Sequence, residues 1–161
     1  MGSSRVEYLS GKGKYVRMFT VDKYGKYSLL LYLDKPSLAI WEQLKSEGIL
    51  NVLKKDDDGD YVRLSRPVKK TFRGIDTVLR PPDVMDKDGK PMVANDWIGN
   101  GSDITAKLTC YTFAKQFGGG TGAAIRLEGI KVHNLVPYVA SDRTPEEQEH
   151  VEGLDTKVQP W

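Results

Sequence analysis

The strand pattern over residues 123–136 changes phase at a glycine, and this change constrains the fold more than any other feature of the chain. Apolar side chains alternate with polar ones up to Gly129 and then continue in the opposite parity. They are Ile125 and Leu127 before the glycine, and Ile130 and Val132 after it. A β-bulge produces such a phase change, because it inserts one extra residue and bends the strand. The pattern therefore predicts a strongly bent sheet that closes into a small barrel.

Most of the remaining chain has the pattern of short strands separated by glycine, proline, aspartate and asparagine turns. The clearest alternation is at 103–112, where one face carries Ile104, Ala106, Leu108 and Cys110. Further strands are expected at 14–21, 26–33, 61–64, 67–73 and 75–80, with hairpin turns at 22–25 and 86–89. Six or more short strands with strong bending predict a mainly β protein of the OB-fold, a five-stranded Greek-key barrel.

One helix is expected near residues 36–47. Asp34 or Ser37 can cap its start, Pro36 suits its first turn, and Gly48 suits the position after its end. Apolar residues recur at helical spacing and predict a stripe facing the barrel. The residues in this stripe are Leu38, Ile40, Trp41 and Leu44.

The last 21 residues, 141–161, reverse the charge of the chain. They hold six acidic and two basic side chains, a net charge of −4. The totals of 24 basic and 22 acidic residues then leave 22 against 16, or +6, for residues 1–140. We therefore predict a barrel domain at 1–140 and an acidic tail at 141–161, in which a capping box at 144–147 indicates a short helix at about 145–152. A basic body can bind a polyanion, and such a tail can compete for that surface.

Several function classes find no support in the sequence. No apolar run approaches the ~20 residues that a membrane-spanning helix needs. His133 and His150 are the only histidines, and the glycine run 118–122 lacks the Gly-Lys-Ser/Thr of a phosphate loop. Cys110 is the only cysteine and lies on an apolar strand face, which excludes an internal disulfide and favours the cytoplasm. We therefore predict no catalytic residue, no metal and no cofactor.

Basic and aromatic residues interleave on the polar faces of the expected strands. This mixture is typical of proteins that hold single-stranded nucleic acid, because cations follow the phosphates while aromatic rings stack on unpaired bases. The chain offers no basic helix for the major groove of a duplex. The DNA-binding candidates are Lys14, Tyr15, Arg17, Lys69, Lys70, Arg73, Lys107, Tyr111, Phe113, Lys115 and Phe117. Among them Lys107 and Tyr111 have the strongest basis, since strand parity turns both away from the apolar face.

Three stretches together resemble phage single-stranded DNA-binding proteins, most closely those of short-tailed phages. They are Trp-Ile-Gly-Asn-Gly-Ser at 97–102 with the strand that follows it, the closing strand at 124–132 that leads to Leu135 and Val136, and an acidic tail with Trp161. The resemblance covers roughly residues 97–136 and the tail. It implies an OB-fold that coats single-stranded DNA during phage replication or recombination, in the cytoplasm of a bacterial host, with no catalytic step and no cofactor.

The resemblance also implies roles for the tail. Related tails contact the replicative polymerase and the helicase–primase, and they support self-association as a homodimer. The residues expected to make these contacts are Glu146, Glu147, Glu149, Glu152, Asp155 and Trp161. Two other non-enzymatic functions fit the residues: an RNA-binding or annealing OB protein, and a virion assembly protein with an incidental basic face. An enzyme would need a convergent polar pocket that the sequence does not reveal.

Overall fold

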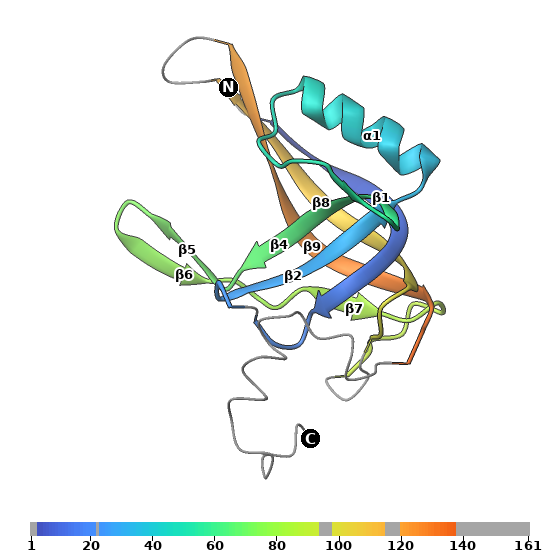
Figure 1. Cartoon of the computed structure of the whole chain (residues 1–161). Coiled ribbons are helices and arrows are strands. Elements are labelled where there is room, and N and C mark those ends of the chain that lie inside the picture. The colour runs from blue at the N-terminus through green and yellow to red at the C-terminus, as the bar shows by residue number, and fades with distance from the viewer. Residues whose placement is uncertain (1–2, 22, 94–97, 115–119, 138–161) are drawn as a thin grey trace.

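The computed structural model describes residues 3–21, 23–93, 98–114 and 120–137 (Figure 1). The elements in chain order are β1 (Ser3–Arg17), β2 (Lys26–Leu33), α1 (Lys35–Ser46), β3 (Lys54–Asp56), β4 (Gly59–Pro67), β5 (Lys69–Phe72), β6 (Ile75–Val78), β7 (Asp83–Met85), β8 (Ser102–Ala114) and β9 (Thr121–Asn134). The acidic tail, including the helix expected at 145–152, lies outside the described residues. The described residues include no helix with the length and apolar character of a membrane span.

Seven strands form one sheet in the order β3-β4-β2-β1-β8-β9-β7. All neighbours are antiparallel except β7 and β9, which are parallel. The two outer long strands, β4 and β9, meet where Arg66 of β4 donates to the carbonyl of Leu127 on β9 at 3.2 Å. The sheet therefore curls into a barrel whose wall consists of the long strands β1, β2, β4, β8 and β9 (Figure 1). The fold is mainly β and OB-like, as the sequence predicts.

The predicted bulge lies in β9. Lys107 of β8 pairs with Gly129, and the next residue, Leu108, pairs with Leu127, so Glu128 has no partner across the ladder. Leu127 and Ile130 are both buried, which explains the change of parity at this point. A side chain at Gly129 would place its Cβ 2.7 Å from the carbonyl oxygen of Asp83, so a glycine is required for β7 to pack here.

Helix α1 covers one end of the barrel and supplies its largest buried side chain, Trp41 (Figure 1). Asp34 caps the helix by accepting a hydrogen bond from the Ser37 amide at 3.0 Å, and Pro36 lies in the first turn. Gly48 follows the C-cap with a φ of 105°, a left-handed conformation that favours glycine. The helix and its caps are therefore confirmed, with bounds one residue earlier than predicted.

The observed strands differ from the expected ones most clearly in three places. Strand β1 begins at Ser3 rather than at residue 14. This early start has no clear apolar pattern, because Leu9 is buried whereas Val6 and Tyr8, on the other face, are exposed. Residues 54–56, where the sequence predicts no strand, form β3, which pairs with the start of β4 around a turn. The predicted strands at 67–73 and 75–80 are shorter and form a separate two-stranded hairpin, β5–β6, that projects from the barrel (Figure 1).

Candidate nucleic-acid interface

The outer surface of β8, together with its neighbours β1 and β9, gathers exposed aromatic and basic side chains. Residues paired directly across a sheet share a face. Lys107 pairs with Tyr8 of β1, and Thr109 pairs with both Val6 of β1 and Arg126 of β9. The inward residues of β8, Ile104, Ala106, Leu108 and Cys110, are all buried. We call the opposite surface the β8–β9 outer face; its members are Val6, Tyr8, Lys107, Thr109, Tyr111, Phe113 and Arg126.

The side chains of this face are available to a ligand. Tyr8 is 54% exposed and Phe113 is 44% exposed, high values for aromatic residues within strands. The Lys107 side chain is exposed, and its ammonium makes no hydrogen bond or ion pair with any other residue that the structure describes. The prediction that Lys107 and Tyr111 point away from the core is confirmed, since all four alternate residues of β8 fill it.

Arg126 contacts both Tyr111 on the β8–β9 outer face and the bulge residue Glu128. Its guanidinium carbon lies 5.4 Å from the centre of the Tyr111 ring, within the range of a cation–π contact. Its Nε donates to the Glu128 carboxylate at 3.2 Å. Arg126 is thus held between an aromatic ring and a carboxylate, and only 26% of its side chain is exposed.

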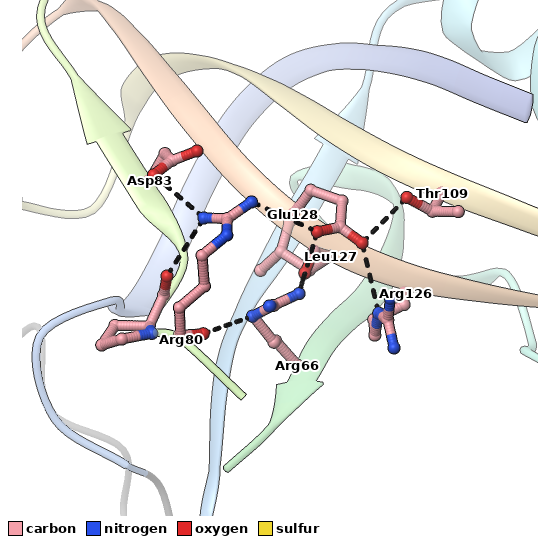
Figure 2. Close-up of polar contacts among 8 residues, drawn as sticks. Arg66, Arg80, Asp83, Thr109, Arg126, Leu127 and Glu128 are labelled. Atoms are coloured by element: carbon pink, nitrogen blue, oxygen red, sulfur yellow. Dashed lines mark hydrogen bonds and ion pairs between the residues drawn. The ribbon is translucent and has the colours of Figure 1, made fainter. Parts of the chain in front are cut away.

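The Glu128 carboxylate is the centre of a compact ionic cluster (Figure 2). One oxygen accepts hydrogen bonds from Thr109 at 2.8 Å and from Arg126. The other accepts from Arg66 at 2.9 Å and lies 3.6 Å from Arg80. Burial raises the pKa of Glu128, but the hydrogen bonds from Thr109 and Arg126 and the nearby arginine charges outweigh it, so the pKa lies below its ordinary value. The bulge residue is therefore ionised at neutral pH.

Arg66 links this cluster to the barrel wall. Its side chain is 4% exposed, and its Nε donates to the carbonyl of Arg80 at 2.7 Å. It also donates to the carbonyl of Leu127, so one guanidinium connects β4, β9 and the segment after β6 (Figure 2). A buried arginine requires this paired and hydrogen-bonded environment. The base of the β5–β6 hairpin is consequently fixed to the bulge of β9.

A groove of about 700 Å³ adjoins the β8–β9 outer face, and Ser10 of β1, Thr105 of β8 and His133 of β9 are among its lining residues. Its charged lining residues are Lys12, Lys14, Asp34, Asp58, Asp60 and Asp103. Lys12 pairs with Asp103 at 2.9 Å, and the hydrogen bond between Lys14 and Asp58 raises the pKa of that lysine. The carboxylates outnumber the lysines here. This groove is therefore less attractive to a polyanion than the β8–β9 outer face.

The other DNA-binding candidates fall into separate places. Lys14, Tyr15 and Arg17 lie around the irregularity in β1, where Tyr15 has a φ of 51° and donates its amide hydrogen to Asn100. The candidates on the β5–β6 hairpin are Lys69, Lys70 and Arg73. Lys115, Phe117 and the tail candidates lie outside the described residues. The structure thus brings Lys107, Tyr111 and Phe113 together and sets the other described candidates apart from them.

Sequence reasoning missed Tyr8 and Arg126. Tyr8 was missed because β1 was expected to begin after it, although Val6 and Tyr8 already show a period of two. Arg126 lies in the predicted closing strand, but its contact with Tyr111 depends on the pairing register between two strands. Alternation of apolar and polar residues predicts which face of a strand a side chain lies on. The residue that it meets on the neighbouring strand depends on the pairing register, which is known only from the fold.

Comparisons with known proteins agree with this architecture. No protein-family model matches the chain, and no curated protein matches its sequence. Among solved structures, the single-stranded DNA-binding protein gp2.5 of bacteriophage T7 is similar, with a TM-score of 0.62, 14% identity, and coverage of 99% of this chain and 100% of that one. The single-stranded DNA-binding protein of bacteriophage Enc34 has a TM-score of 0.54, 11% identity, and 89% coverage of both chains. The resemblance predicted from the sequence is therefore confirmed at the level of the fold.

Proposed function

We propose that this protein binds single-stranded DNA along the β8–β9 outer face and protects it during phage DNA replication or recombination. The observation that carries the proposal is the position of Lys107, exposed and without a partner among the described residues, on one face with Tyr8, Tyr111 and Phe113. The fold is shared with two phage proteins that bind single-stranded DNA. The proposed role involves no catalytic step.

The chemistry of this face suits unpaired rather than paired bases. Aromatic rings offer stacking surfaces for any base, and each stacked base contributes about 1–3 kcal/mol. Lys107 and Arg126 place positive charge beside these rings for the phosphates. In a duplex the bases are already stacked on each other, so the rings gain nothing there. Binding is therefore expected to favour single strands with little sequence preference.

Other parts of the chain are proposed to extend the interface. Lys14, Tyr15 and Arg17 would contact DNA around the irregularity in β1. The basic β5–β6 hairpin would contact it through the side chains of Lys69, Lys70 and Arg73. Lys115 and Phe117 are also proposed to contact DNA. The acidic tail with Trp161 would contact replication proteins or a second copy of this chain. The expected location is the cytoplasm of a bacterial host.

The full chain should bind a fluorescent oligo-dT more tightly than a duplex of equal length, measured by titration at about 50 and 200 mM salt. Affinity should fall with salt, with a slope of log K against log salt of about −0.7 for each phosphate contact. Equal affinity for the duplex would contradict the stacking argument. Tighter binding of a matched RNA strand would favour an RNA-binding protein. Absence of salt-sensitive binding would favour a virion assembly protein.

Tyr111→Ala should weaken oligo-dT binding by about fivefold, on the order of 1 kcal/mol, because one stacking ring is lost. Lys107→Ala should also weaken binding and reduce the salt slope by about 0.7. Lys45→Ala is the matched control, since this exposed lysine lies on α1 rather than on the proposed interface. Thermal unfolding should show intact folds. The interface is misplaced if neither variant binds differently from the control.

A further inference from the structure

The cluster around Glu128 holds more positive than negative charge. Its members are Arg66, Arg80 and Arg126 against Glu128 and Asp83, a net charge of +1. Arg66 is buried and donates to two backbone carbonyls as well as to Glu128. The excess charge therefore lies with the two less buried arginines, Arg80 and Arg126, whose side chains are 54% and 26% exposed.

Arg126 retains donors that nothing in the described part of the chain uses. A guanidinium has five N–H groups, and its terminal nitrogens form a planar fork that matches two oxygens of a phosphate. In Arg126 the Nε donates to Glu128, whereas the two Nη atoms make no hydrogen bond to any described residue. The unused part of the side chain is thus the part suited to binding an anion.

The position of Arg126 is fixed before any ligand arrives. Glu128 accepts a hydrogen bond from the Nε of Arg126, and the Tyr111 ring lies against the guanidinium of Arg126. Less side-chain freedom is then lost on binding, which lowers the cost of forming a contact. Its cross-strand partner is Thr109, two residues from Lys107 and two from Tyr111. A phosphate at Arg126 would therefore lie directly beside the proposed stacking rings.

We propose that Arg126 is a phosphate-binding residue for the single strand, using its two Nη atoms, with Glu128 and Tyr111 as the groups that orient it. This inference rests on the proposed function and adds a specific backbone contact to it. The ligand class is a phosphodiester of an unpaired strand. Glu128 does not compete for the same donors, because it occupies the Nε side of the guanidinium.

The proposed phosphate contact of Arg126 can be tested by titrating the full chain with oligo-dT over a range of salt concentrations. The proteins compared are wild type, Arg126→Gln, Arg126→Lys and the control Lys45→Gln. Arg126→Gln should bind about fivefold more weakly at low salt, with a salt slope smaller by about 0.7, because one phosphate contact is lost. Arg126→Lys should keep the slope and lose part of the affinity, because an ammonium keeps the charge without the fork. Against a methylphosphonate oligo-dT, whose backbone is uncharged, wild type and Arg126→Gln should bind alike.

Two results would overturn the inference while leaving the proposed function in place. One is an Arg126→Gln protein with wild-type affinity and slope. The other is weaker binding with an unchanged slope, which would mean that Arg126 acts through the fold and not through a phosphate. If wild type itself does not bind oligo-dT, the proposed function fails and the inference fails with it. Thermal unfolding of each variant shows whether its fold is retained.

Discussion

Glu128→Gln should lower the free energy of unfolding by about 3–5 kcal/mol, the usual cost of removing one partner from a buried ion pair. The reason is Arg66, whose side chain is 4% exposed and whose charge would lose its ionised partner. Glutamine keeps the size of the side chain, so the change tests charge rather than packing. Urea denaturation of both proteins measures the difference. Glu42→Gln, at an exposed position of α1, is the control and should change stability little.

The ion pair between Glu128 and Arg66 should make the free energy of unfolding depend on pH. The pKa of Glu128 in the folded protein lies below the ordinary value of 4.5. A carboxyl group with a lowered pKa contributes its full stability above about pH 4.5, and this contribution is lost as pH falls through the folded-state pKa. Wild type should therefore lose its advantage over Glu128→Gln below about pH 4.5. An equal difference between the two proteins at pH 7 and pH 3 would contradict the role of the charge.

The parts of the fold that local sequence specifies were predictable. The bulge at Gly129 was visible because the strand on both sides of it is buried on one face, so the change of parity appears in the apolar residues themselves. Helix α1 was visible because Asp34, Pro36 and Gly48 act on the backbone within one turn of its ends. The bulge and the helix ends are therefore each specified by residues that lie at the same point of the chain.

The parts that depend on pairing between distant segments were not predictable. The first half of β1 is held by β8, about a hundred residues later in the chain, and its own alternation exposes Val6 and Tyr8. Strand β3 is three charged residues at a sheet edge, where no apolar pattern is required.

The candidate site shows the same division. Lys107 and Tyr111 could be placed by parity within a single strand. The contact of Arg126 with Tyr111 could not, because it requires the register of β8 against β9, including the bulge. The pairing of Lys14 with Asp58 likewise joins residues 44 positions apart. A strand pattern therefore predicts which side chains face solvent, and the fold decides which of them remain available to a ligand.

Deleting residues 141–161 should tighten oligo-dT binding by about tenfold at low salt. These residues carry a net charge of −4 beside a body of +6, and a tethered competitor acts at an effective concentration on the order of 1 mM. An exposed cation such as Lys107 is the kind of group that the tail and the DNA phosphates would share. The gain should shrink at high salt, because exposed charges are screened beyond about 10 Å at 0.1 M. Salt-dependent titration of the full and shortened chains measures both effects.

Substitution of Trp161 distinguishes the two proposed roles of the tail, competition with DNA and contact with a protein partner. An indole ring carries no charge, so it has no part in a competition for phosphate-binding cations. Trp161→Ala should therefore leave the oligo-dT affinity within about twofold of wild type, while it weakens self-association or binding to a replication protein by removing a large apolar contact. Sedimentation at several concentrations follows self-association without DNA. If the deletion weakens DNA binding instead, the tail supports the barrel or its interface, and the competition between tail and DNA does not exist.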